Sequence, residues 1–315
     1  MPRREWQSDG VSGPRIVVLV SGGAAVTPFT TPDRAAATGL AAGNTLTALR
    51  ARLLAADLHV VTAPARVGGG TVTEDAGWQG FGDVPEVLPA EITINSVGGL
   101  DAAGAALDGF LEHLESTLGA ASFDLVGHSM GGLFARAAIG RRRSRPDAAP
   151  VRRLVTLGTP WTGALLGDFV AGDVTLADAQ GDATTEAILR EAGTFAAEHS
   201  EGAAEQVSER YLAGPGGWNA RQSGALDGID VTLVAGGRLH TAASPAMLWP
   251  HDGLVARRSA LAELVPSDVL PAASRAEFDD VHSIFFADRL GLPWAAALTW
   301  DPEVLDLIER TIRPD

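Results

Sequence analysis

A serine stands at the centre of the motif Gly127-His128-Ser129-Met130-Gly131, directly after the apolar run at 123–126. An apolar run, a glycine-flanked serine and a helix-compatible stretch at 130–139 are typical of a nucleophile elbow, a sharp turn from strand to helix that exposes a serine hydroxyl. Glycine on both sides allows strand and helix to pass closely. The motif predicts that Ser129 is a nucleophile, against the alternative of a turn serine that only caps a helix.

A serine hydroxyl is a poor nucleophile at neutral pH and needs a base, usually histidine, within hydrogen-bond reach. Three histidines follow Ser129 late enough for the chain order Ser, Asp, His, namely His240, His251 and His282. His282 lies on an expected loop before the apolar residues 284–286 and is the best candidate. The alternative is a loop histidine that pairs with the neighbouring aspartates.

A buried carboxylate is expected to orient the base. Asp252, followed by glycine and the apolar pair 254–255, comes after an expected strand and is the best candidate, with Asp230 and Asp279 as alternatives. An Asp-Gly pair is also a common turn signal. The developing oxyanion needs two fixed backbone N–H donors. Met130 is expected to supply one and Gly23 the other, with Ala24 as an alternative to Gly23.

The elements that must position these residues alternate along the chain. Buried-strand patterns occur at 15–20, 58–62, 123–126, 152–157 and 229–235, and helical patterns at 44–56, 101–118 with Asp101 as N-cap, 130–139 and 301–312. This alternation predicts an α/β fold with a mainly parallel sheet in one domain spanning 1–315. Residues 164–222 are expected to form a helical cap, with Val207 and Tyr211 on one helix, and 64–97 a long loop.

Composition narrows the class of protein. The chain of 315 residues has a net charge of −15, which argues against a nucleic-acid partner and for repulsion from anionic membrane surfaces. It has no cysteine, which excludes disulfides and thiolate chemistry. We expect no cofactor, no metal and no stable membrane insertion. No apolar stretch of signal-peptide length follows the N-terminus, so the expected location is cytoplasmic, with a secreted protein whose signal segment has been removed as the alternative.

Two segments carry a family resemblance. Residues 123–136 look like the nucleophile segment of bacterial lipases and esterases of the α/β-hydrolase fold, and 151–160 resemble the strand that follows it in triacylglycerol-lipase-like members. The resemblance implies a triad of Ser129, His282 and Asp252 that hydrolyses a small-molecule or lipid ester through an acyl-enzyme. An acyltransferase or thioesterase using the same acyl-enzyme is the alternative, and a non-catalytic binding scaffold is a second one.

The chain departs from the family pattern at two positions. Ser21-Gly22 stands where the family commonly has His-Gly after the first strand, and Trp161 replaces the usual histidine after Gly-Thr-Pro. We expect Trp161 to narrow or flatten a substrate pocket to which His128 and Ala24 also contribute. The arginine run at 141–145 is interpreted as a solvated helix end.

Overall fold

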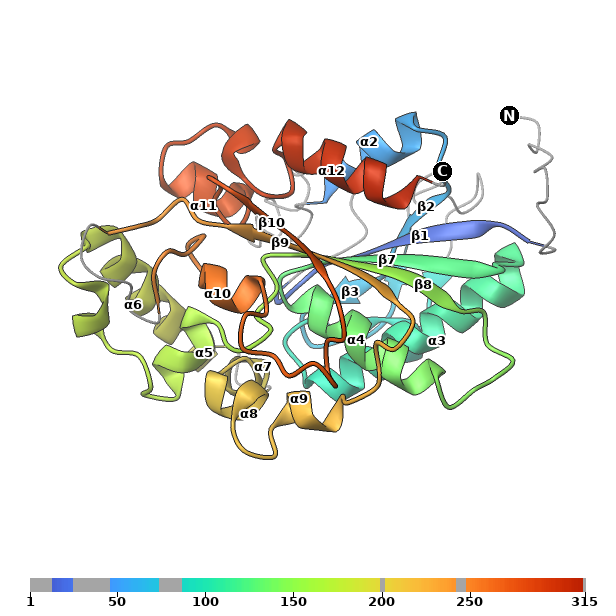
Figure 1. The fold of residues 1–315 in the computed structure, drawn as a ribbon, viewed down its shortest axis with the longest axis horizontal. Helices are drawn as coiled ribbons and strands as arrows, with labels where there is room; N and C mark the ends of the chain where they lie inside the picture. Colours follow the sequence, from blue (N-terminus) through green and yellow to red (C-terminus); the bar gives the residue numbers. More distant parts are fainter. Residues whose placement is uncertain (1–12, 25–45, 74–86, 199–201, 242–247, 314–315) are drawn as a thin grey trace.

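A twisted sheet crosses the molecule with helices on both faces (Figure 1). The computed structural model describes residues 13–24, 46–73, 87–198, 202–241 and 248–313. The sheet has the strand order β10-β9-β8-β7-β1-β2, and all of its neighbouring strands are parallel. The predicted α/β fold with a parallel sheet is therefore confirmed. The strands are β1 (Arg15–Val20), β2 (Val60–Thr62), β7 (Ser122–His128), β8 (Val151–Leu157), β9 (Asp230–Gly236) and β10 (Ser274–Phe278).

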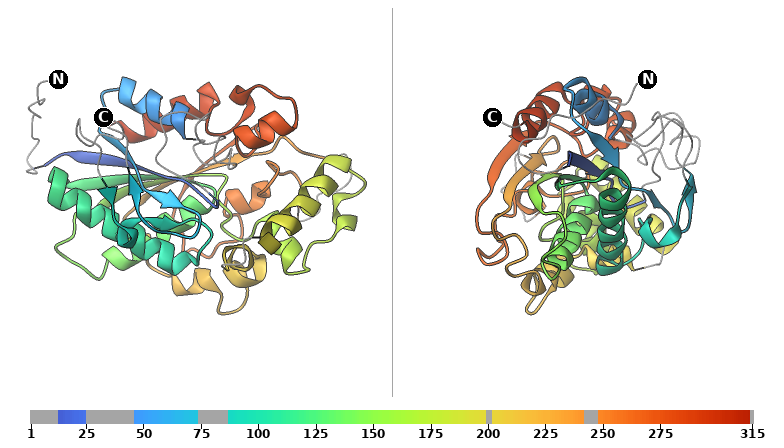
Figure 2. Two further views of the ribbon diagram at one scale, coloured as in Figure 1. Left: turned by 180° about the vertical axis from the view of Figure 1, so that it is seen from behind. Right: turned by 90° about the vertical axis from the view of Figure 1, so that its right-hand side faces the viewer.

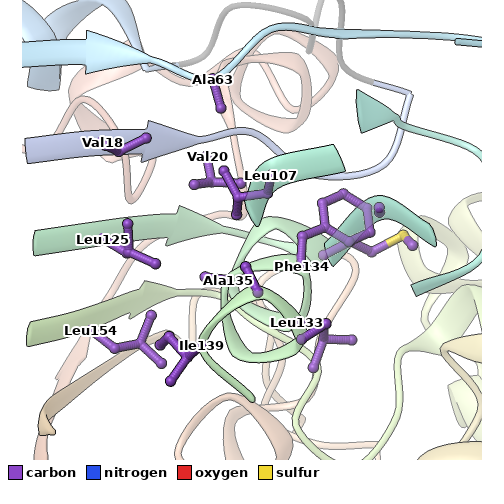
Figure 3. Close-up of a cluster of buried hydrophobic side chains, with 14 of the residues drawn as sticks. Val18, Val20, Ala63, Leu107, Leu125, Leu133, Phe134, Ala135, Ile139 and Leu154 are labelled. Carbon is purple, nitrogen blue, oxygen red and sulfur yellow. The ribbon is translucent and has the colours of Figure 1, made fainter. Parts of the chain in front are cut away.

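The central strands read as continuous apolar runs because both faces of the sheet are covered. In β1, Val18 and Val20 face one core while Val17 and Leu19 face the other. The first core is closed by α3 (Leu100–Leu118) and α4 (Met130–Arg142), and Figure 3 shows Leu107 and Phe134 of these helices in one cluster with Val20 and Leu125 of the strands. The second core is closed by α2 (Thr47–Ala55) and α12 (Pro302–Ile312).

Two expectations for the first half of the chain are wrong. Gly99, not Asp101, is the N-cap of α3, and the Asp101 carboxylate instead accepts a hydrogen bond from the Trp218 indole at 2.8 Å. The stretch 64–97 is not a plain loop either. Its described residues form the short strands β3 (Ala65–Arg66), β4 (Val72–Thr73), β5 (Val87–Leu88) and β6 (Ile94–Asn95), together with the 3-10 helix η2 (Ala90–Ile92). The strands β3 and β6 form one small sheet, and β4 and β5 form another.

The chain between β8 and β9 forms helices joined by turns in its described residues and covers one end of the sheet (Figures 1 and 2). We refer to this segment, residues 165–221, as the cap. Val207 and Tyr211 do not share a helix as predicted, because Ser208 between them accepts a hydrogen bond from the Tyr211 N–H and starts a new one. The cap contains α5 (Leu165–Val170), η3 (Leu176–Ala179), α6 (Ala183–Glu198), α7 (Ala203–Gln206), α8 (Glu209–Ala213) and α9 (Trp218–Arg221).

The remaining helices follow the cap, namely α10 (Arg257–Ala260), α11 (Ile284–Arg289) and η4 (Trp294–Ala296). Within the described ranges, none of the helices has the length and apolar character needed to cross a bilayer. The end of α4 is solvated at Arg141 and Arg143, as expected from the arginine run, but not at the arginine between them. Arg142 is buried and donates hydrogen bonds to the carboxylates of Asp108 and Glu115.

Candidate active site

Ser129 lies in a strained turn between β7 and α4. Its φ of 56° and ψ of −133° fall in a region that residues other than glycine rarely adopt. The turn is held from both sides, because the Ser129 N–H donates to the Leu157 carbonyl at 2.8 Å and the Thr159 hydroxyl donates to the Ser129 carbonyl at 2.8 Å. The backbone of the serine is thus fixed by β8 and the residues after it, and its side chain reaches a cavity wall.

The glycines of the elbow are present because larger residues would collide with the backbone. A Cβ atom at Gly131 would lie 2.1 Å from the Val20 carbonyl oxygen, and one at Gly127 would lie 2.5 Å from the Gly132 nitrogen. These contacts place the start of α4 directly against the end of β1. The predicted close passage of strand and helix is therefore confirmed.

Asp252 and His282 meet at the ends of neighbouring strands. Asp252 follows β9 and His282 follows β10, and His282 Nδ1 lies 2.7 Å from Asp252 Oδ2. The backbones are also joined, because the His282 N–H donates to the Asp252 carbonyl at 2.7 Å. Both side chains are buried. The carboxylate therefore fixes the orientation of the imidazole and holds its proton on Nδ1.

The other Asp252 oxygen is fixed by the backbone. Oδ1 accepts hydrogen bonds from the N–H groups of Leu254 at 2.9 Å and Val255 at 2.7 Å. The two alternative acids have different surroundings, because the Asp230 and Asp279 side chains are 81% and 69% exposed and pair with arginines. Asp252 is the candidate acid that the fold brings to His282.

The alternative bases occupy other positions. His240 is exposed and contacts the Arg238 carbonyl through Nδ1. His251 is buried, and its Nδ1 accepts the Gly253 N–H at 3.1 Å while Nε2 donates to the Thr185 hydroxyl at 3.2 Å. Burial lowers the pKa of His251 to about 4, so its imidazole is neutral at pH 7. Its role in the structure is to shape the turn that carries Asp252.

His128 packs against His282 and not along the wall of the substrate cavity, where we expected it. The two ring centroids are 4.6 Å apart, and His128 Nε2 donates to the His282 carbonyl at 2.8 Å. Burial, and secondly repulsion from the neighbouring His282 ring when that ring is protonated, lower the pKa of His128 to about 3. His128 is therefore a neutral donor that joins the residue next to the elbow serine to the loop that carries His282.

The second ring nitrogen of His282 is free. Nε2 is buried and has no hydrogen-bond partner within the described parts of the chain, so Ser129 Oγ and His282 Nε2 are not hydrogen-bonded in this conformation. Catalytic hydrogen bonds are often long in structures without substrate and tighten on binding. The arrangement leaves one nitrogen that can accept a proton close to the elbow.

Two backbone donors are available beside the serine. The N–H groups of Gly23 and Met130 have no hydrogen-bond partner among the described residues. Ala24, the alternative to Gly23, already donates its N–H to the Ser96 carbonyl at 3.1 Å. The stretch before Gly23 lies against the elbow, because a Cβ atom at Gly22 would lie 2.5 Å from the Ser129 Cβ and 3.0 Å from the Met130 nitrogen.

Ser129 borders a cavity of about 320 Å³ between the sheet and the cap. Ala24 lies on its wall as expected, and Glu191 carries the only charge among the described lining residues. The apolar side chains from α6, α7 and α11 were not predicted as pocket residues, although the apolar run after His282 was a usable signal. The lining comprises Gly23, Ala24, Ser96, Val97, Ser129, Met130, Pro160, Ala164, Leu166, Ile188, Glu191, Ala192, Ala203, Ala204, Val207, Leu254, Val255, Phe285 and Phe286.

Trp161 lies outside this cavity, which corrects the expectation that it narrows the pocket. Its side chain is fully buried, its indole N–H donates to the Thr156 hydroxyl at 3.2 Å, and its ring covers the Arg136 guanidinium at 4.2 Å. A buried cation needs compensation that an aromatic face can supply. Trp161 therefore serves the packing of α4 and leaves the cavity wall to Pro160 and Ala164.

Comparisons with known proteins agree with this architecture. A family model described as palmitoyl protein thioesterase matches residues 75–197, which include Ser129 but neither Asp252 nor His282. No curated protein sequence matches the chain. The crystal structure of the lipase BlEst2 from Bacillus licheniformis in its mature form is similar over 96% of this chain and 94% of its own, with 13% identity and a TM-score of 0.53.

The propeptide form of the same Bacillus licheniformis lipase is similar over 98% of this chain, with 12% identity and a TM-score of 0.55. This chain covers 52% of the length of that form. Identities at this level carry information on the fold alone. The structural similarity agrees with the parallel sheet, the nucleophile elbow after β7 and the helical cap between β8 and β9. Together these features show that the chain has the α/β-hydrolase fold.

Proposed function

We propose that the protein is a serine hydrolase that cleaves carboxylic esters through an acyl-enzyme on Ser129. The observation that carries this proposal is the hydrogen bond between His282 Nδ1 and Asp252 Oδ2, which leaves the Nε2 lone pair of His282 without a partner in the described structure. An imidazole held in this tautomer is a base for a nearby hydroxyl. The apolar cavity beside Ser129 suits an acyl group.

In the proposed reaction, Ser129 Oγ attacks the acyl carbonyl carbon while His282 Nε2 takes the hydroxyl proton. Asp252 stabilises the resulting imidazolium, and the N–H groups of Met130 and Gly23 donate to the oxyanion. The tetrahedral intermediate collapses, the C–O bond to the alcohol breaks, and His282 gives its proton to the leaving alcohol. Water then attacks the acyl-enzyme with His282 again as base, which releases the carboxylic acid and restores Ser129.

The test combines labelling with turnover. Intact mass after treatment with a fluorophosphonate should show one adduct on the parent protein and none on Ser129→Ala. The same variant should lose at least about 10⁴-fold in kcat on a p-nitrophenyl ester while keeping its circular dichroism spectrum and melting temperature. A Ser129→Ala variant with full activity, or a parent protein that takes up no label and turns over no ester, would favour the binding-scaffold alternative.

Hydrolysis of a thioester is the second candidate. The family model named for palmitoyl protein thioesterase covers the elbow segment, which favours this variant of the reaction. The chemistry at Ser129 is the same, with a thiol as the leaving group. Matched oxygen and sulfur esters of one acyl group separate the two candidates by their kcat/KM values. Product analysis with added alcohol, amine or thiol acceptors distinguishes hydrolysis from acyl transfer.

A further inference from the structure

The cavity beside Ser129 has a wall of small side chains on the cap side. Ser129, Met130 and Gly23 border the cavity from the sheet, and Ala192 of α6 with Ala203 and Ala204 of α7 border it from the cap. These three alanines are 7–8% exposed. All three line the cavity and are nearly buried, so we expect a larger side chain at these positions to take up part of the space that a substrate occupies.

Close packing of the cap helices fixes the position of this wall. A Cβ atom at Gly167 of α5 would lie 2.4 Å from the Val207 backbone, so α5 and the end of α7 are in direct backbone contact. Next to Ala192, a Cβ at Gly193 would lie 3.1 Å from the Phe169 ring of α5. Because α5 packs against both α6 and α7, the wall cannot shift to lengthen the cavity without repacking three helices.

The opening of the cavity lies elsewhere. Among the described lining residues, only Glu191 and Phe285 are exposed. Glu191 of α6 pairs with Arg289 at the end of α11, the helix that also carries Phe285. The described rim is therefore charged on one side and apolar on the other, whereas the alanine wall is buried.

The volume of the cavity limits what can fill it. A water molecule occupies about 30 Å³ in the liquid, and a methylene group is of similar size, so a cavity of about 320 Å³ accommodates about ten carbons. We propose, on the basis of the proposed esterase function, that this cavity is the acyl site and that Ala192, Ala203 and Ala204 set an upper limit of about ten carbons on the acyl chain. A sixteen-carbon chain exceeds the space by several methylene groups.

The experiment measures kcat/KM for p-nitrophenyl esters from acetate to palmitate, kept below their critical micelle concentrations. Each methylene that enters the cavity should raise kcat/KM by about fourfold, up to octanoate or decanoate. The value should then fall at least tenfold by palmitate. Ala192→Leu and Ala203→Leu should move the optimum at least two carbons shorter.

The matched control is Ala197→Leu, an exposed position on the same helix α6 that does not line the cavity. This variant should keep the parent profile. A palmitate ester that is hydrolysed as well as octanoate would overturn the inference, as would an unchanged profile in both cavity variants. If a cavity variant does not fold, the other variant and the parent profile still decide the question.

A binding measurement separates this inference from the proposed function. The affinity of Ser129→Ala for straight-chain alcohols of four to sixteen carbons should rise with length and level off near ten. A plateau without any ester turnover in the parent would contradict the esterase proposal and leave the length limit standing. Turnover together with affinity that still rises to sixteen carbons would leave the esterase proposal standing and overturn the length limit.

Discussion

Asp252 and Asp279 are both aspartates that precede His282 in the chain, but they have opposite surroundings. Asp252 is buried and bonded to the imidazole, whereas the Asp279 carboxylate is 69% exposed and pairs with Arg238. We expect Asp252→Asn to lower kcat by about 10⁴-fold, because an amide neither stabilises the imidazolium nor holds the proton on Nδ1. Asp279→Asn is the control, and ester turnover should stay within about twofold. Equal losses in the two variants would contradict the assignment of the acid.

Asp280, two residues before His282, makes stability depend on pH. Its side chain is buried, and burial together with the charge and hydrogen bond of Asp301 raises its pKa to about 8. A carboxyl whose pKa is raised on folding stabilises the protein in its protonated form. That contribution is complete below about pH 4, the ordinary pKa of an aspartate side chain. It is lost as the pH rises through the raised pKa of about 8.

Asp280→Asn removes this titration. Relative to the variant, the parent should lose about 2 kcal/mol or more of unfolding free energy between pH 4 and pH 8. Urea denaturation of both proteins at several pH values measures the difference. Parallel stability curves for the two proteins would show that Asp280 has an ordinary pKa.

At the residue scale, chain order and motif were sufficient to select Asp252 and His282, and the structure brings them into hydrogen-bond contact. Their catalytic roles stay predictions. Trp161 and His128 were placed wrongly because their positions depend on buried partners distant in sequence. Trp161 packs in the core against the Arg136 guanidinium, and His128 packs against the His282 ring and not along the cavity. A local sequence pattern does not predict contacts between side chains that are distant in sequence.

At the scale of elements, the contact between α4 and β1 should tolerate no added bulk. Gly131→Ala would bring a methyl group to about 2.1 Å from the Val20 carbonyl oxygen, where only backbone could move away. We expect a loss of about 2–4 kcal/mol in unfolding free energy, together with lost turnover because Ser129 shifts. Gly140→Ala on the same helix meets the flexible end of Gln222 at 3.2 Å and the Ala225 Cβ at an ordinary contact distance of 3.6 Å, and should cost little. Denaturation curves and ester turnover of the two variants check this.

Arg136 joins the elbow helix α4 to α9 of the cap. Its guanidinium is fully buried between the Trp161 and Trp218 rings at 4.2 and 4.8 Å, and it donates to the Asn219 side chain at 3.0 Å. We expect Arg136→Ala to lose about 3 kcal/mol of stability through the cavity and the lost cation–π contacts. Arg136→Met fills most of that space without a buried charge and should lose less. Thermal and urea unfolding measure both, and equal losses would show that charge, not volume, holds these elements together.

Helices and strands with a clear apolar pattern or cap could be predicted from the sequence, whereas a polar edge strand and a helix break could not. The helix α12 matches its prediction, because Asp301 caps it and Pro302 starts it. The strand β10 was missed because it lies at the sheet edge, and its residues 274–278 are exposed or half-buried and largely polar. The division of the chain around Ser208 into α7 and α8 was missed because the apolar spacing of Val207 and Tyr211 continues across the break.

At the scale of the whole molecule, charge should discriminate between substrate classes. The chain carries a net charge of −15, and its cavity opens beside Glu191. Such a field repels anionic substrates and leaves neutral ones unaffected, and salt screens it over a Debye length of about 10 Å at 0.1 M ionic strength. An anionic thioester such as an acyl-coenzyme A should therefore show a kcat/KM that increases with added sodium chloride. The neutral p-nitrophenyl ester of the same acyl group should respond little.

The comparison uses octanoyl groups on both carriers between 20 and 300 mM salt, so that the acyl site contributes equally to both series. Glu191→Gln should weaken the salt dependence for the thioester, because it removes the charge closest to the opening. A kcat/KM for the anionic thioester that falls with salt would mean that Arg289, which pairs with Glu191 at the rim, attracts the carrier locally against the overall field. That outcome would favour an anionic thioester over a neutral ester as the substrate.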